Sequence, residues 1–365
     1  MHRIALATEK GPAAGSSMPH DPSGETAPRS YLFDEAFSPT LDECILGDAD
    51  QQRIGRVRCR MAREILRRQA EYDAVVTWGE KLSFALLTQQ WMARVSKPHI
   101  ALMYQFEKPN IRVPLAALKR GLHAVVTWSS VQRQVLIESI RYPAERVYLI
   151  RHYVDQLFYS PRGEVDEMIC AVGAEMRDYA TFKTAVNGLG IRCHIATDHV
   201  RIPGRIRLLN DRRVPIDNIG DETDKCITQG RLTLVELRNL YARSRFVVIP
   251  LLPSDTDNGV TCILQAMAMG KPVICSRTRG QVDVIQEGIT GLYVPVGDAD
   301  ALRTAIVSLW NDPERVRRMG QHARAYVEKY HTLEMFTSTV RSAAEASLDG
   351  QAAPDTWWEK RSVIA

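Results

Sequence analysis

The stretch FVVIPLLPSDTDNGVTCILQAMAMG, from Phe246 to Gly270, decides the fold of this chain. It opens with a short apolar run, continues into a polar segment that contains Gly259, and ends in an amphipathic helical pattern. That order predicts a buried strand, a loop and a helix that packs back on the sheet. The stretch is therefore one βα unit of an α/β protein.

The rest of the chain repeats this alternation in two halves. The aperiodic segment Tyr153–Glu164 carries Pro161 and Gly163, and we place the crossover between two domains there. The predicted boundaries are an N-terminal domain at 1–155, a C-terminal domain at 156–331, and a helix with a tail at 332–365. Strands are expected at 3–8, 74–78, 99–105, 124–128 and 147–152 in the first half, and at 168–172, 192–197, 246–252, 272–276 and 292–295 in the second.

Two strands of the first half end alike, in Asp73-Ala-Val-Val-Thr-Trp78 and His123-Ala-Val-Val-Thr-Trp128. Ligands of open parallel sheets bind beyond the carboxyl ends of the strands. Trp78 and Trp128 are therefore expected either near a ligand site or as packing residues that cap their strands.

Composition argues against a nucleic-acid-binding protein, a zinc ribbon, a disulfide-rich protein and a membrane-spanning protein. The chain has 365 residues and a net charge of +4, which is too small to indicate a nucleic-acid partner. Its seven cysteines are scattered, which fits reduced thiols rather than a zinc ribbon or a disulfide framework. No run approaches the roughly 20 apolar residues of a membrane span, and the N-terminus lacks a secretory pattern, so we expect a cytoplasmic protein.

The loop before the helix at 261–269 has the character of an anion site. Free N–H groups and the positive end of the helix dipole converge at a helix N-terminus. Gly259 permits close approach of a phosphate, and the amides from Asn258 through Val260 to Thr261 would face it. Thr261 and Gln265 share one face of the helix, and Ile263, Ala266 and Met267 line the apolar one.

The order of motifs in the second half resembles that of the retaining family 4 glycosyltransferases. Asp257 is followed by seven residues, Gln265 and then Ala266-Met-Ala-Met-Gly-Lys-Pro-Val273. Arg279-Gly-Gln-Val-Asp283 is similar to the family's Gly-Gly-x-x-Glu, and the string from Glu287 to Asp298 is a close match. Leu149–Phe158 resembles the family's crossover, whereas the first 145 residues match only in layout.

The resemblance implies a GT-B fold, in which two Rossmann-like domains have parallel sheets facing a central cleft. It further implies transfer of a sugar from a nucleoside diphosphate sugar to an acceptor hydroxyl, with retention of anomeric configuration and with no metal or other cofactor. The acceptor would be a glycan, a lipid-linked molecule or a small molecule. A GT-B epimerase and a nucleotide-sugar-binding, non-catalytic subunit are the alternatives.

The resemblance also suggests residue roles. Asp257 would orient the donor sugar and Gln265 the ribose, although both family positions are usually Glu. Arg177 is the only cation near the family's usual phosphate-binding Lys, so we assign it to the diphosphate; the alternative is a surface pair with Glu175 or Asp178. Asp283 is expected to position the loop after Ser276.

Other expectations concern residues outside this assignment. The family's active-site His falls near Tyr104 or Gln105, so no catalytic base is assigned. Asp255-Thr-Asp257 spells a metal-binding pattern of a different glycosyltransferase fold, and we expect no metal here. Lys271 precedes its strand and is predicted to face solvent.

A basic helix in the first half offers a further surface. Its arginines recur at intervals of three and four residues and form one stripe. The stripe is either a solvated outer face or a peripheral contact with an anionic membrane, which would place the protein at the inner membrane face. The residues are Arg53, Arg56, Arg60, Arg63 and Arg67.

Overall fold

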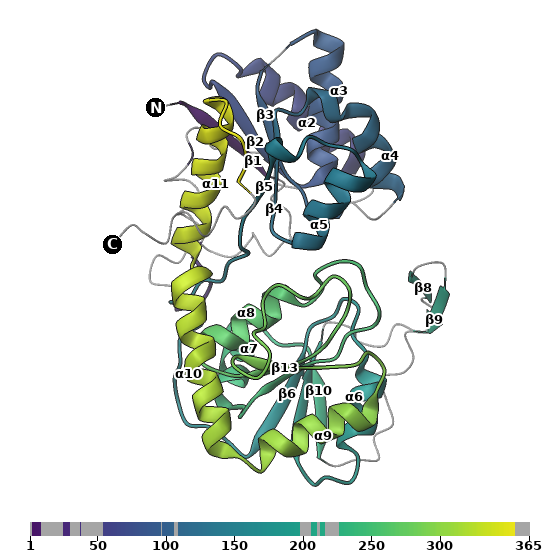
Figure 1. Ribbon diagram of the computed structural model, residues 1–365, viewed down its shortest axis with the longest axis vertical. Helices are drawn as coiled ribbons and strands as arrows, with labels where there is room; N and C mark the ends of the chain where they lie inside the picture. Colours follow the sequence, from purple (N-terminus) through teal and green to yellow (C-terminus); the bar gives the residue numbers. More distant parts are fainter. Residues whose placement is uncertain are drawn as a thin grey trace. The chain divides into compact units, whose positions relative to one another are not determined.

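The computed structural model describes residues 2–8, 25–29, 37, 54–95, 97–105, 109–197, 206–209, 212–215 and 226–354. The chain divides into two compact units, and each contains one parallel sheet (Figure 1). The first unit comprises 1–22, 29–152 and 333–365, and the second comprises 23–28 and 153–332. The Gly- and Pro-rich segment at 10–30 and the tail that carries Trp357 and Trp358 lie largely outside the described residues.

The first sheet has five parallel strands in sequential order, β1-β2-β3-β4-β5. Its strands are apolar and buried on both faces, as expected where helices cover a parallel sheet. The strands are β1 (Ile4–Thr8), β2 (Ala74–Trp78), β3 (His99–Leu102), β4 (Ala124–Thr127) and β5 (Val147–Leu149).

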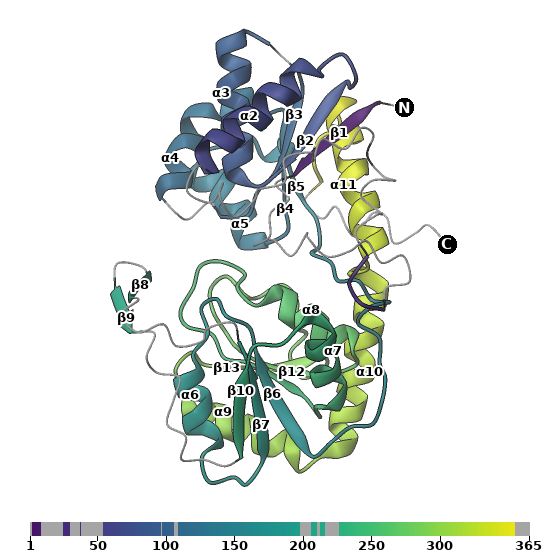
Figure 2. The ribbon, with the colours of Figure 1, turned by 180° about the vertical axis from the view of Figure 1, so that it is seen from behind.

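Helices α2 to α5 connect these strands. Right-handed crossovers between neighbouring parallel strands in sequential order place every connecting helix on the same face of the sheet. Figures 1 and 2 show this layer on one side of the sheet and α11 on the other. The connecting helices are α2 (Ile54–Arg67), α3 (Glu80–Ala93), α4 (Pro109–Leu118) and α5 (Ser130–Gln134), the last continued by a π-helical turn at Val135–Ser139.

The last helix, α11 (Leu333–Leu348), belongs to the first unit. The sequence predicts this helix after the C-terminal domain but does not indicate which unit it packs against. The ring centroid of Phe336 lies 5.8 Å from that of Trp78 and 6.4 Å from that of Trp128. The ring centroids of the two tryptophans are 6.5 Å apart. The hydroxyl of Tyr148 donates to the carbonyl of Gln351. The two tryptophans therefore pack against the chain's last helix.

The second sheet has six parallel strands in the order β10-β7-β6-β11-β12-β13. β10 was not predicted, because its sequence, ITQG, is too polar to be recognised as a strand. The strands are β6 (Met168–Val172), β7 (Arg192–Ala196), β10 (Ile227–Gly230), β11 (Val247–Ile249), β12 (Val273–Ser276) and β13 (Gly291–Val294). A separate hairpin pairs β8 (Ile206–Leu209) with β9 (Arg212–Pro215).

In the ranges that the structure describes, five helices surround this sheet. Thr233 and Glu236 form a capping box at the start of α7. Ile263, Ala266 and Met267 of α8 are fully buried, so the predicted apolar face of that helix is confirmed. The helices are α6 (Tyr179–Val186), α7 (Leu234–Arg243), α8 (Val260–Ala268), α9 (Ala299–Trp310) and α10 (Pro313–Tyr330).

The prediction that Lys271 faces solvent is wrong. Its side chain is 8% exposed, and Nζ donates to the carbonyl of Ala242 at 2.7 Å. Ala242 lies in the last turn of α7, where carbonyls lack partners within the helix and the dipole is negative. Burial lowers the pKa of Lys271 to about 8. Lys271 therefore caps a helix from the amino end of β12.

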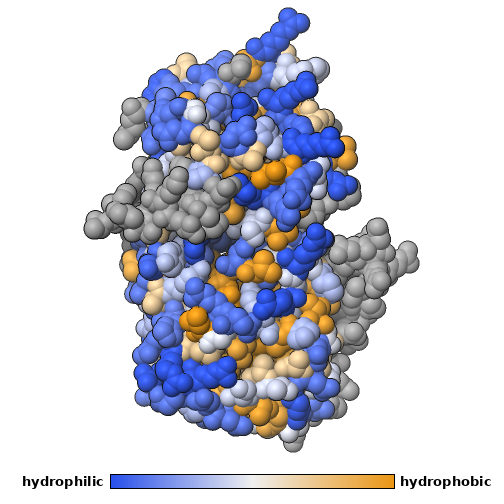
Figure 3. All heavy atoms as spheres, viewed as in Figure 1, coloured by the Kyte–Doolittle hydropathy of each residue, from blue (hydrophilic) through white to orange (hydrophobic). Residues whose placement is uncertain are grey.

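The surface shows no large continuous apolar face in the view of Figure 3, where hydrophobic residues are scattered among hydrophilic ones. Among the described residues, no helix is long and apolar enough to cross a bilayer.

Candidate functional site

The loop between β11 and α8 lies at the carboxyl edge of the second sheet. Gly259 is the N-cap of α8 and has φ +90°, a conformation that strains any residue with a side chain. A Cβ at this position would lie 3.0 Å from Ile249. Both the positive φ and this close approach favour glycine at position 259. Without a side chain, the backbone here can lie close to the end of β11.

Arg177 lies beside this helix N-terminus. Its backbone forms an antiparallel bridge with Leu251, and its NH2 group is 3.5 Å from Sγ of Cys262, in the first turn of α8. Nε donates to the carbonyl of Val172 at 2.8 Å, and NH1 donates to that of Glu175. A side chain on Gly173 would collide with this guanidinium, because its Cβ would be 2.2 Å from NH2.

The surface pair that was the alternative for Arg177 does not form. Arg177 contacts the carbonyl of Glu175 rather than its carboxylate, and the Asp178 carboxylate caps α6 through the amide of Thr181. These contacts occupy three of the five guanidinium N–H groups, so the remaining two can meet a ligand. The half-buried cation is fixed between the ends of β6 and β11 and the start of α8.

The first turn of α8 supplies amide donors to the same place. The amide of Val260 is taken by the carbonyl of Asp257 at 3.1 Å. Those of Thr261 and Cys262 have no backbone partner among the described residues. Thr261 is exposed and Asp257 is half-buried.

Two loops interlock to shape this site. The side-chain oxygen of Asn258 accepts hydrogen bonds from the hydroxyls of Ser254 and Thr256, so this side chain stabilises the loop to which it belongs. The amide of Gly280 donates to the carbonyl of Ser254, and a Cβ on Gly280 would lie 2.2 Å from the carbonyl oxygen of Thr256. No side chain other than hydrogen fits there.

Gln281 is the functional candidate that the sequence did not reveal. Its side chain is 1% exposed, and its Nε2 donates to the carbonyls of Asp257 and Asn258, both at 3.2 Å. Asp283, to which we assigned the positioning of this region, is exposed. The buried glutamine two residues earlier braces the Asp257 loop directly.

Gln265 faces a buried tyrosine. The hydroxyl of Tyr241 lies 3.1 Å from Oε1 of Gln265, and Tyr241 is fully buried. Burial raises the pKa of Tyr241 well above its usual value, so the hydroxyl stays protonated and donates. The Gln265 carbonyl is therefore engaged, and its NH₂ group remains as the donor.

The Asp255-Thr-Asp257 pattern does not assemble a metal site among the described residues. No group of three or more His, Cys, Asp or Glu side chains in these ranges is placed to hold an ion. Asp255 is instead 3.7 Å from the guanidinium of Arg279.

The loop after β3 in the first unit is held from two sides. Glu80, buried at the start of α3, accepts from the amides of Tyr104 and Gln105 at 2.6 and 2.8 Å. Nε2 of Gln132 donates to the carbonyl of Tyr104 at 2.7 Å. These are the two positions where the family's His was expected, and their backbone is held by side chains of α3 and α5. The Tyr104 ring stacks on Trp128.

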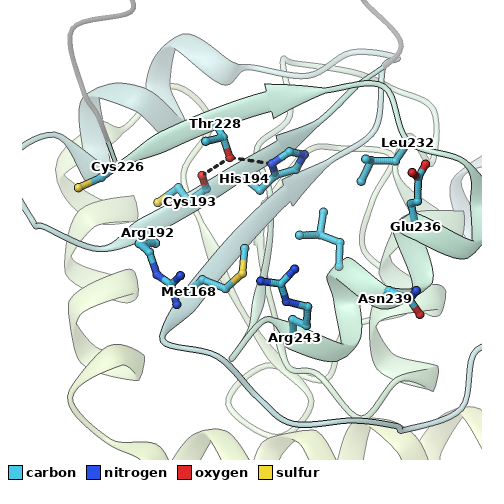
Figure 4. Close-up of a pocket in the computed structure, with 11 residues that line it drawn as sticks. Met168, Arg192, Cys193, His194, Cys226, Thr228, Leu232, Glu236, Asn239 and Arg243 are labelled. Carbon is cyan, nitrogen blue, oxygen red and sulfur yellow. Dashed lines mark hydrogen bonds between the residues drawn. The ribbon is translucent and has the colours of Figure 1, made fainter.

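A separate cavity of about 490 Å³ lies between α7 and strands β7 and β10 (Figure 4). Nδ1 of His194 lies 2.7 Å from the hydroxyl of Thr228, and burial followed by the charge of Arg243 lowers the pKa of His194. The lining shares no residue with the loop at 254–261.

Comparisons with known proteins agree with this architecture. A family model described as glycosyl transferases group 1 matches residues 186–312. The sulfoquinovosyl transferase SQD2 of Arabidopsis thaliana is 31% identical over 138 residues, which cover 37% of this chain and 25% of that protein. The chain thus spans about a quarter of the length of the curated relatives it matches.

Solved structures match over nearly the whole chain. A glycosyltransferase from Rickettsia africae covers 96% of this chain and 100% of its own, with a TM-score of 0.67 at 15% identity. Anabaena Alr3699/HepE, solved in complex with UDP and glucose, covers the same shares with a TM-score of 0.65 at 14% identity. The chain therefore has the GT-B fold, and residues 186–312 of its second unit match the family model of the glycosyl transferases group 1.

Proposed function

We propose that this protein is a glycosyltransferase that moves a sugar from a nucleoside diphosphate sugar to an acceptor hydroxyl. The observation that carries the proposal is the convergence of the Arg177 guanidinium with the first turn of α8, next to Gly259. A fixed cation and helix-terminal amides are the groups that meet the charge developing on a leaving diphosphate. The HepE structures with UDP support the same ligand class by analogy of fold.

The proposed reaction retains the anomeric configuration. The bond between the anomeric carbon and the diphosphate oxygen breaks, and the acceptor oxygen bonds to that carbon on the same face. The acceptor proton passes to the leaving diphosphate, so neither a metal nor a further cofactor is required. The acceptor is a glycan, a lipid-linked molecule or a small molecule, and no nucleic acid takes part.

Each site residue has a role in this proposal. Arg177 and the amides of Asn258, Gly259 and Thr261 stabilise the diphosphate. The amide of Val260, which was also assigned to this role, is instead bonded to the carbonyl of Asp257. Asp257 orients the sugar. Gln265 meets the ribose with an N–H donor, since its carbonyl is held by Tyr241. Asp283 stays a weaker candidate at the edge of the donor site.

Titration calorimetry with UDP, GDP and ADP tests donor binding. We expect one diphosphate to bind, and Arg177→Met to weaken it roughly 10- to 100-fold, as for the loss of charge-assisted hydrogen bonds. The same change should leave binding of the nucleoside unaltered. Arg317→Met, which removes an exposed arginine of α10, is the matched control. Equal loss in both variants, or no binding of any nucleotide, would contradict the proposal.

Turnover distinguishes transfer from its alternatives. Asp257→Ala should abolish acceptor-dependent release of the nucleoside diphosphate while the thermal unfolding midpoint stays near that of the wild type. Conversion of the donor without any acceptor would indicate an epimerase. Donor binding without turnover across a broad acceptor panel would indicate a non-catalytic subunit.

A further inference from the structure

The helical layer of the first unit presents one continuous outer surface. Because β1 to β4 are parallel and adjacent in sequential order, α2, α3 and α4 lie on the same face of the sheet. Figures 1 and 2 agree on this arrangement. Residues of these helices that point away from the sheet therefore share a surface, which we call the outer face of α2–α4.

Positive charge is concentrated in this part of the chain. Residues 53–120 contain fourteen Lys and Arg against five Asp and Glu, a net charge of +9, whereas the whole chain has +4. Arg67 is paired with Glu64, yet the surplus of cations remains large. The basic residues that the structure places in exposed positions on or next to these helices are Arg60, Arg63, Arg67, Lys81, Arg94, Arg112 and Arg120.

Large apolar side chains are exposed among these cations. Trp91 and Met92, at the end of α3, are 78% and 64% exposed, and Val113 of α4 is 66% exposed. They are the three most exposed of the large apolar residues that the structure describes. Within the described part of the chain, this tryptophan and these two aliphatic side chains lie in a basic surface and not in the core.

We propose that the outer face of α2–α4 is a docking surface for an anionic lipid bilayer. Basic side chains are attracted to anionic headgroups, and an exposed tryptophan is suited to the interface because its ring is amphipathic. Met92 and Val113 favour lipid over nucleic acid, because aliphatic side chains can enter the acyl boundary but gain little from phosphates or base edges. The surface extends across three helices the part of the predicted arginine stripe that is exposed on α2, namely Arg60, Arg63 and Arg67. Arg53 and the side chain of Arg56 lie outside what the structure describes. The docking surface does not depend on the proposed sugar transfer.

Vesicle flotation tests the apolar part of this surface. We expect the full-length protein to float with phosphatidylcholine vesicles that contain phosphatidylglycerol, at low salt, and not with pure phosphatidylcholine. Trp91→Ala with Met92→Ala should reduce the bound fraction at least tenfold. The matched control is Leu157→Ala with Val165→Ala, which truncates two exposed apolar residues of the second unit.

A second pair of variants tests the charge. Arg60→Gln with Arg63→Gln should weaken the vesicle partition coefficient about 25-fold, since each arginine contributes roughly fivefold near an anionic surface. Arg317→Gln with Arg318→Gln removes two exposed arginines of α10 and should have little effect. Far-UV circular dichroism checks that every variant is folded.

Depth of insertion gives an independent readout. Brominated lipid in the same vesicles should quench wild-type tryptophan fluorescence, and Trp91→Phe should lose most of that quenching. No flotation with anionic vesicles, or equal flotation of the control and surface variants, would overturn the proposal. Binding to duplex nucleic acid in place of vesicles, or a dimer that Trp91→Ala dissociates, would assign the surface to those partners instead.

Discussion

The hydroxyl of the buried Tyr241 donates to Oε1 of Gln265 at 3.1 Å, so a residue of α7 determines which end of an amide on α8 is available to a ligand. Tyr241→Phe removes this donor and lets the amide rotate. We expect nucleotide affinity to fall about fivefold and stability to fall by about 1 kcal/mol. Titration calorimetry and urea unfolding measure the two effects, and an unchanged affinity would show that Gln265 does not contact the nucleotide.

Gln265→Glu should have the opposite effect on affinity. Tyr241 would then donate to a carboxylate oxygen, and the second oxygen would accept from a ribose hydroxyl with charge-assisted strength. We expect nucleoside diphosphate to bind about five- to tenfold more tightly at pH 7. The same substitution should not improve binding of inorganic pyrophosphate, which has no ribose and serves as the control ligand.

Gln281 should matter both for the stability of the second unit and for donor binding. Gln281→Met keeps the volume but removes both hydrogen bonds to the Asp257 loop. We expect a loss of about 1 kcal/mol in unfolding free energy, because two half-buried carbonyls lose their donor. Donor affinity should also fall, and Asp283→Asn, a change at an exposed position nearby, is the comparison. A larger effect from Asp283→Asn would reverse the assignment between these residues.

Lys271 predicts a specific pH dependence of stability. Its pKa is about 8 in the folded protein against an ordinary value of 10.5, with burial as the largest cause. Between these values the unfolded chain binds a proton that the folded one does not, so Lys271 makes stability rise with pH in that window. Below pH 8 both states are protonated and the contribution is constant.

The measurement compares wild type with Lys271→Met by urea unfolding at pH 8 and pH 9.5. The difference in unfolding free energy should shift in favour of the wild type by about 2 kcal/mol over this interval. Taking the difference cancels the titration of tyrosines and cysteines common to both proteins. A shift of the opposite sign would mean that the buried amine is stabilised as a cation.

Arg324 should be a stability residue of the second unit. Its NH1 group lies within 2.7–3.0 Å of the carbonyls of Gln156, Tyr159 and Ala268, which joins the crossover segment to α8 and α10. Arg324→Met keeps the aliphatic stem but leaves these carbonyls without their donor. We expect about 2–4 kcal/mol of destabilisation by urea unfolding. Arg317→Met, on the same helix but exposed, should cost under 1 kcal/mol.

The sequence predicted the position of those helices and strands whose buried residues form a strong local pattern of apolar side chains. The strands at Ala74–Trp78 and Met168–Val172 have the predicted bounds. The polar edge strand at 227–230 and helix α4, which contains Pro114, were missed because their local preference opposes their structure. Tertiary contacts override propensity in both.

In the candidate site, too, some features could be predicted from the sequence and others could not. The loop and the Gly259 turn follow from local chemistry, and they lie where the sequence placed them. The partners of Lys271, Gln265 and Gln281 come from segments 23 to 29 residues away in the chain. Periodicity carries no information on such contacts. For that reason a lysine predicted to be exposed is buried, and the bracing glutamine had no predicted role.

The placement of α11 has a consequence for how the protein is made. Because the first unit includes residues 333–365, it is built from both ends of the chain. During synthesis the segment up to residue 152 emerges long before the helix that covers its Trp78 and Trp128, whereas the second unit is complete by residue 332. The unit that begins first in sequence is thus finished last, and a fragment of the first half expressed alone would expose the aromatic surface that α11 normally covers.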